Sequence, residues 1–120
     1  MAPAVRVSHV NLPVPHGTSA AVADFYADVF GFIRSTERPD TGRAGAWLDV
    51  GDGTQVHLSE RDGTAHPDQH VAFVVERFEE LAERAAAAAV EWTDRGPGRA
   101  VLRDPAGNLV EVFAPEAAPG

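Results

Sequence analysis

An internal repeat constrains this chain more than any other feature of its sequence. The six residues that begin at His9, His-Val-Asn-Leu-Pro-Val, align with the six that begin at His70, His-Val-Ala-Phe-Val-Val. A turn at Gly53 aligns in the same way with a turn at Gly107, and residues 55–58 then fall on residues 109–112. Repetition at this spacing predicts two copies of one supersecondary unit that pack together.

The first copy is predicted to contain a strand, a helix and three further strands. Alternating side chains indicate a strand over residues 5–14. Apolar residues at helical spacing indicate a helix that begins at Thr18 or Ser19 as N-cap and ends at Gly31. Short strands separated by glycine-bearing turns are expected at residues 32–37, 46–50 and 54–59.

The second copy repeats this order. A strand is expected at residues 69–75, then a helix from Phe78 through the alanine run to Ala89, then strands at 91–92, 99–103 and 109–113. The tail, residues 114–120, is expected to fray. We therefore predict an α+β fold in a single domain, residues 1–120, in which two βαβββ modules form curved mixed sheets around a cleft. The modules are expected at about residues 5–62 and 66–115.

The repeat pairs four residues whose side chains can bind a metal. His9 is equivalent to His70, and His57 is equivalent to Glu111. Apolar neighbours flank these positions and should face the helices, so strand alternation turns the four side chains toward the opposite, concave face. Imidazole and carboxylate ligands suit Zn, Ni, Co, Mn or Fe, and four of them leave open positions for a substrate. Other residues expected on this face are Asn11, Gln55, Ser59 and Trp47 or Asp49, and the substrate contacts expected among them are Asn11, Trp47 and Gln55.

Composition narrows the class of ligand. The absence of cysteine excludes thiolate ligands and disulfides. A net charge of −8 without a basic run argues against a nucleic-acid partner. No stretch is apolar enough for a leader or a membrane span, so we expect a cytoplasmic protein that binds a small molecule. Arg43, Arg95 and Arg99 lie in or near loops and could attract an anionic substrate, whereas His16 and His66 are expected to be ordinary loop residues.

These segments resemble the vicinal oxygen chelate superfamily, which includes glyoxalases, epimerases, extradiol dioxygenases, fosfomycin-resistance transferases and bleomycin-resistance proteins. The resemblance covers about residues 5–115. It is carried by SHVNLPV, DFYADVFGF, QVHLSE, QHVAFVV followed by FEELAERA, and RDPAGNLVEVF. It implies two βαβββ modules, a cleft that a homodimer commonly completes, and metal ligands on the first and last strands of each module. Those positions fall on His9, His57, His70 and Glu111.

The resemblance leaves three functions open. The first is a metal-dependent, glyoxalase-like lyase or isomerase, in which Glu111 moves a proton and His57 is a ligand or a second base. Glyoxalases usually have Glu at the position of His57, so this chain departs from them there. The second is a bleomycin-resistance-like protein that binds a drug without catalysis. The third is an Fe(II) extradiol-type dioxygenase that uses His9, His70 and Glu111 and leaves His57 as acid/base.

Overall fold

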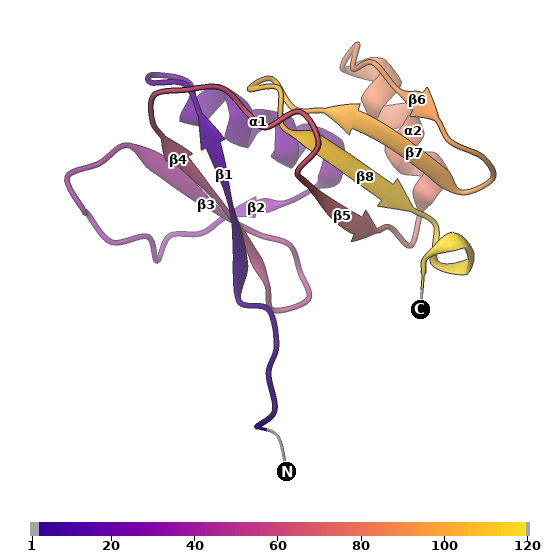
Figure 1. The fold of residues 1–120 in the computed structure, drawn as a ribbon, viewed down its shortest axis with the longest axis horizontal. Coiled ribbons are helices and arrows are strands. Elements are labelled where there is room, and N and C mark those ends of the chain that lie inside the picture. Colours follow the sequence, from indigo (N-terminus) through magenta and orange to yellow (C-terminus); the bar gives the residue numbers. More distant parts are fainter. Residues whose placement is uncertain (1–2, 120) are drawn as a thin grey trace.

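Two four-stranded sheets, each with one helix, make up the computed structural model, which describes residues 3–119 (Figure 1). The predicted βαβββ repeat and its α+β class are confirmed. The first module contains β1 (His9–Val14), α1 (Ser19–Phe30), β2 (Ile33–Arg34), β3 (Gly45–Asp49) and β4 (Gln55–Glu60). The second contains β5 (His70–Val74), α2 (Phe78–Ala87), β6 (Thr93–Asp94), β7 (Arg99–Arg103) and β8 (Leu109–Phe113), followed by a 3₁₀ turn, Pro115–Ala117.

The two sheets have the same strand order and the same register. The orders are β1-β4-β3-β2 and β5-β8-β7-β6, with the first strand parallel to the last in each module. His9 lies opposite Gln55, and His70 lies opposite Leu109. Because residues 55 and 109 are also equivalent in sequence, the structure reproduces the repeat residue by residue.

Apolar side chains from one face of each sheet form the core with the helices. Val56 and Leu58 of β4 are buried, as are Val110 and Val112 of β8, while the residues between them are half-buried. Figure 1 shows both helices behind the sheets, so the opposite faces are free of helices. Strand alternation therefore places the core where the sequence predicted it.

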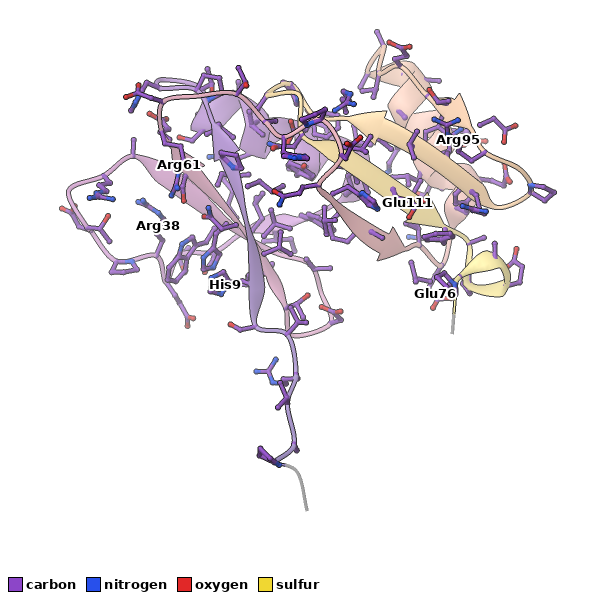
Figure 2. All side chains as sticks on the ribbon, viewed as in Figure 1. His9, Arg38, Arg61, Glu76, Arg95 and Glu111 are labelled. Carbon is purple, nitrogen blue, oxygen red and sulfur yellow. The ribbon has the colours of Figure 1, made fainter. Side chains whose placement is uncertain are left out.

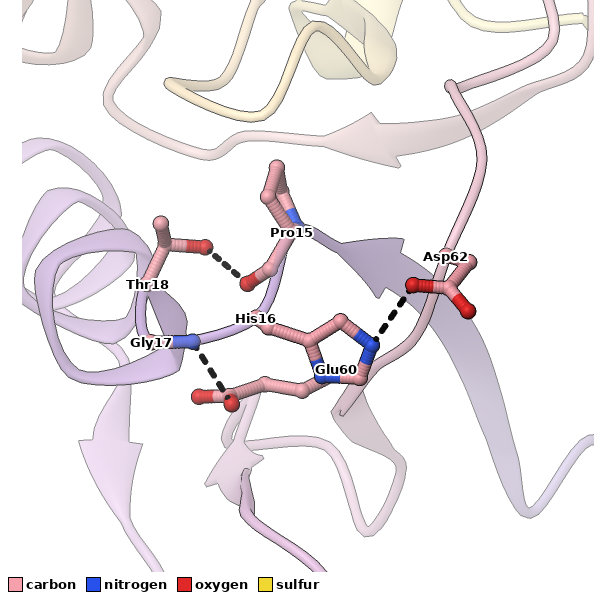
Figure 3. A network of polar contacts seen from close by, with 6 residues as sticks. All are labelled: Pro15, His16, Gly17, Thr18, Glu60 and Asp62. Atoms are coloured by element: carbon pink, nitrogen blue, oxygen red, sulfur yellow. Dashed lines mark hydrogen bonds and ion pairs between the residues drawn. The ribbon is translucent and has the colours of Figure 1, made fainter.

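The helices begin and end through contacts from different parts of the chain. Gly31 ends α1 in the left-handed conformation with φ 75°, as predicted. The Thr18 side chain does not cap this helix, because its hydroxyl donates to the Pro15 carbonyl. Instead the Glu60 carboxylate accepts from the backbone N–H groups of Gly17 and Ser19 (Figure 3 draws the Gly17 contact).

No helix within residues 3–119 combines the length and apolar character needed to cross a membrane.

Two expected strands have different bounds in the structure, and part of the C-terminal tail forms a turn. The strand expected at residues 32–37 is limited to residues 33–34, and the one expected at 91–92 lies at 93–94. Trp92 packs edge-on against Phe78 with ring centroids 5.5 Å apart, so core packing holds this segment out of the sheet. Within the tail expected to fray, residues 115–117 form a 3₁₀ turn, and the Ala114 N–H before it donates to the Gly98 carbonyl at 2.8 Å; residue 120 lies outside the described residues.

A buried polar network joins the modules. The Tyr26 hydroxyl donates to Asp104 Oδ2 at 2.8 Å, and Asn108 Nδ2 donates both to Asp104 Oδ2 at 3.0 Å and to the Pro13 carbonyl at 2.9 Å. Burial raises the pKa of Tyr26 well above its ordinary value, and the neighbouring Asp104 charge and hydrogen bond add to the rise. The network ties α1 and β1 to the β7–β8 turn, so it helps to set the position of β1 relative to β8.

Candidate metal and substrate site

The register of module one arranges its open face in three rows across β3, β4 and β1. Side chains of one row point to the same side of the sheet. Trp47, His57 and Asn11 form the middle row. The rows on either side of it are Gly45, Ser59 and Pro13, and Asp49, Gln55 and His9. The predicted substrate contacts of this module therefore share one face with both of its histidines.

Three aromatic rings stack on this face. The His57 ring lies between those of His9 and Trp47, with centroid distances of 3.8 Å and 4.2 Å and interplanar angles of 15° and 4°. His9 is exposed, whereas His57 and Trp47 are half-buried. The stack provides a flat wall with an imidazole at its centre.

A polar chain orients His57 within the stack. Gln55 Nε2 donates to Asp49 Oδ1 at 2.8 Å, which turns the Gln55 carbonyl oxygen toward His57 Nε2, also at 2.8 Å. An amide oxygen only accepts, so His57 Nε2 carries the proton. The nitrogen that keeps a free lone pair in the neutral ring is therefore Nδ1.

The environment of His57 favours its neutral form. Burial lowers the pKa of His57, and the positive charges of His9 and Arg38 lower it further. A neutral imidazole can accept a proton or bind a metal, whereas the imidazolium can do neither.

Module two presents the other predicted pair, His70 and Glu111. His70 Nδ1 donates to the Asp68 carbonyl at 2.8 Å, which leaves Nε2 facing Glu111 Oε1 at 3.6 Å. Arg99 Nη2 lies 3.7 Å from the other Glu111 oxygen. A lone pair on Nε2 and an anionic oxygen face each other here, and a proton or a metal ion between them would stabilise the pair.

The structure does not bring the four predicted ligands together within one chain. His9 and His57 belong to the first sheet, and His70 and Glu111 to the second, and Figure 2 labels His9 and Glu111 on these separate strands. Across residues 3–119, no three His, Asp or Glu side chains lie close enough together to hold a metal. The four-residue metal site therefore stays a prediction.

The remaining candidates from the sequence have ordinary partners or exposed positions. His16 pairs with Asp62 at 3.0 Å on the surface (Figure 3), and His66 Nδ1 accepts from two backbone N–H groups of its own loop. Arg43 and Arg95 are exposed. Both histidines lie in loops, as expected.

Sequence reasoning missed two features. One is the half-buried Arg38, which no motif distinguishes from the other arginines. The other is a groove of about 310 Å³ at the junction of β1 and β5, which has Asn11, His66 and His70 among its lining residues. Neither could be found from the sequence, because both depend on how separate segments pack.

The profile of a protein family, described as the Glyoxalase/Bleomycin resistance protein/Dioxygenase superfamily, matches residues 6–112. The chain belongs to this superfamily. Residues 5–115, over which the sequence resembles the vicinal oxygen chelate proteins, cover almost the same range. The resemblance and the two-module fold are both confirmed.

Solved structures of the superfamily share this fold. A glyoxalase family protein from Bacillus anthracis is 23% identical, with a TM-score of 0.83 over 95% of this chain and 98% of that one. Lactoylglutathione lyase from Agrobacterium tumefaciens is 22% identical, with a TM-score of 0.69 over 96% and 97%.

A mutant of the fosfomycin resistance protein FosX from Listeria monocytogenes is 20% identical, with a TM-score of 0.76 over 93% of both chains. Its structure contains Mn(II) and 1S,2S-dihydroxypropylphosphonic acid. No curated protein sequence matches this chain. At these identities the solved structures establish the fold alone.

Proposed function

We propose that this protein is a metal-dependent lyase or isomerase of the glyoxalase type, acting on a small oxygenated substrate bound through two oxygens. One observation carries the proposal: identical strand registers place His9 with His57, and His70 with Glu111, at equivalent positions in the two sheets. A structural role for any one histidine would not require this pairing.

The donor set fits a divalent cation. His70 Nε2 and Glu111 Oε1 face each other at 3.6 Å, and the Asp68 carbonyl holds the proton of His70 on the other ring nitrogen. Backbone and carboxylate partners of this kind commonly orient metal-binding histidines. Nitrogen and oxygen donors are compatible with Zn, Ni, Co, Mn or Fe, and the FosX relative that holds Mn(II) supports a metal of this class. When bound, the metal would act as a Lewis acid that polarises two substrate oxygens.

Glu111 is the proposed proton-transfer base. Its carboxylate is one-fifth exposed and lies near His70 and Arg99. In an isomerisation it would take the proton from the carbon beside the substrate carbonyl and return it to the neighbouring carbon. His57, with Nε2 held by Gln55, offers its free Nδ1 for a second proton transfer on the module-one side.

We further propose that a homodimer completes the site. The donor pairs are separate within one chain, and a second copy can bring the first-module face of one subunit to the second-module face of the other. This arrangement would build two equivalent sites per dimer.

Elemental analysis of the purified protein tests this function. We expect close to one transition metal per chain, with strong loss in His9→Ala, His70→Ala and Glu111→Ala. His16→Ala and His66→Ala are the matched controls, because they remove loop histidines outside the donor set and should keep the metal. Absence of metal after reconstitution with Zn, Ni, Mn and Fe(II) would overturn the proposal and favour small-molecule binding against Trp47.

A second candidate is an Fe(II) extradiol-type dioxygenase. Its donors would be His9, His70 and Glu111, and the hydrogen bond from His57 Nε2 to Gln55 favours it by holding His57 as an acid/base with Nδ1 free. Oxygen consumption by the Fe(II)-loaded protein with a catechol would support this reaction. Exchange of a substrate proton with solvent deuterium without oxygen uptake would support the lyase or isomerase.

A further inference from the structure

Arg38 differs from every other arginine of the chain in its burial. It lies in the connection between β2 and β3 and is half-buried, whereas the other nine arginines are exposed. Burying part of a guanidinium is costly unless its charge and N–H groups find partners. The position of Arg38 therefore needs an explanation.

The described part of the chain supplies Arg38 with little compensation. No carboxylate of residues 3–119 forms an ion pair with its guanidinium, although the chain has 18 acidic and 10 basic residues. Its hydrogen bond is from Nη2 to the Arg43 carbonyl at 2.8 Å. A guanidinium has five N–H donors, so most of them are available to another acceptor.

The guanidinium is positioned against the open face of module one. A Cβ built on Gly45 would lie 2.5 Å from the Leu58 carbonyl oxygen and 2.9 Å from Arg38 Nη2, so the missing side chain leaves room for both the neighbouring strand and the arginine. Gly45 begins β3 and shares its row with Ser59, next to the row of Trp47 and His57. At two residues along a strand, the rows are about 7 Å apart. In Figure 2 Arg38 lies beside the strands of this module, in the same region as His9.

We propose that Arg38 binds an anionic group of the substrate, a carboxylate or a phosphonate, while the remainder of the substrate lies along the Trp47–His57 wall. A planar guanidinium with free N–H groups binds such oxyanions through paired hydrogen bonds. The inference rests on the proposed function for the other end of the substrate, which would reach the metal. It narrows the proposed substrate to molecules whose anionic group lies about 7 Å, one row of side chains, from the part that contacts the His57 ring.

NMR titration of the full ¹⁵N-labelled chain with methylphosphonate and with acetate tests this assignment. The titrations use the protein as purified and again after dialysis against a chelator. We expect saturable shifts of the Arg38 Nε–H and the Trp47 indole N–H signals. Arg38→Gln should weaken binding about tenfold or more, the loss expected for a charge-assisted contact.

Arg43→Gln is the matched control. It removes the same charge from the same loop but keeps the backbone carbonyl that holds Arg38, so binding should stay within about twofold of wild type. Preference for methylphosphonate would assign phosphonates, and preference for acetate would assign carboxylates. An equal loss in both variants, or no saturable shift with either anion, would overturn the proposal.

Binding by the chelator-treated protein separates this inference from the proposed function. An anion that binds at Arg38 in a protein without metal content would support the inference even if the metal proposal fails. A protein that binds metal but does not bind either anion at Arg38 would support the proposed function and overturn this inference.

Discussion

Tyr26 is the residue whose side chain most directly joins the two modules. It is completely buried, and its hydroxyl donates to Asp104, a carboxylate that also accepts from Asn108 and from two backbone N–H groups. Such a network is stable only when each buried polar atom has a partner. The buried side-chain polar atoms of residues 3–119 all have one.

Tyr26→Phe should lower the free energy of unfolding by about 1–3 kcal/mol, because it removes one hydrogen bond to a buried carboxylate. Asp104 Oδ2 keeps its bond from Asn108, so the lower end of this range is expected. Urea unfolding followed by circular dichroism measures the change. An unchanged midpoint would show that the hydroxyl contributes nothing to joining the modules.

Tyr26 also predicts the behaviour of the protein at alkaline pH. Its pKa is raised in the folded state, so it contributes stability that is fully present below the unfolded pKa of about 10. This contribution is lost as pH rises from there toward the folded pKa. Tyr26 is the one tyrosine of the chain and all ten basic residues are arginine, so few other groups titrate in this range. Between pH 9 and 11 the free energy of unfolding of the wild type should fall more steeply with pH than that of Tyr26→Phe. Equal slopes in the two proteins would contradict the assignment.

At the scale of single elements, the ends of the two helices differ in their residues. Gly31 ends α1 with φ 75°, a conformation that glycine adopts without a steric penalty. After α2 the chain turns at Ala89 with φ 57°, which is unfavourable for a residue with a Cβ. The left-handed residue that follows the helix is thus an unstrained glycine in the first module and a strained alanine in the second.

Exchanging these residue types should have opposite effects. Ala89→Gly should raise the free energy of unfolding by up to about 1 kcal/mol, and Gly31→Ala should lower it by about 1 kcal/mol or more. A Cβ at position 31 would also lie 3.3 Å from Arg84 Nη1, although that flexible side chain can move. Thermal unfolding of both variants checks the signs. A stability loss in Ala89→Gly would mean that the left-handed turn costs this chain nothing.

At the scale of the whole molecule, the separation of the two donor pairs suggests how the site is assembled. Each module presents one pair, and the Tyr26–Asp104–Asn108 network holds the modules so that the pairs do not meet within residues 3–119. A second copy that places opposite modules face to face would join them. This arrangement makes a specific prediction about mixtures of variants.

Mixing His9→Ala chains with Glu111→Ala chains should restore metal binding if each site draws its donors from both subunits. Random mixing makes about half of the dimers mixed, and one of the two sites in each is then intact, so about a quarter of the wild-type metal is expected. Elemental analysis after joint refolding measures it. A mixture as empty as its two components would place all the donors in one chain and contradict the dimer proposal.

Much of the architecture was predictable from particular residues. Alternation around His57 and Glu111 predicted β4 and β8 and their open faces, and Gly31 predicted the end of α1. Thr18 is the N-cap residue of α1 as predicted, but Glu60 from another strand supplies the capping contacts in place of its side chain. The strand at residues 91–92 was wrong, because Trp92 packs against Phe78. These contacts join residues distant in the chain or compete with local preference, so local patterns do not report them.

The sequence by itself determined the repeat, the two βαβββ modules and the equivalence of the four candidate metal ligands, because side-chain periodicity and turn residues act over short distances. Only the tertiary structure decided that Gln55 orients His57, that Arg38 is half-buried over Gly45, and that the donors form two separate pairs. The donor pairs lie on segments far apart in the chain, whereas Gln55 and His57, and Arg38 and Gly45, are close in sequence. In all three cases the outcome depends on side-chain orientation and on how strands and loops pack, which no local pattern reports.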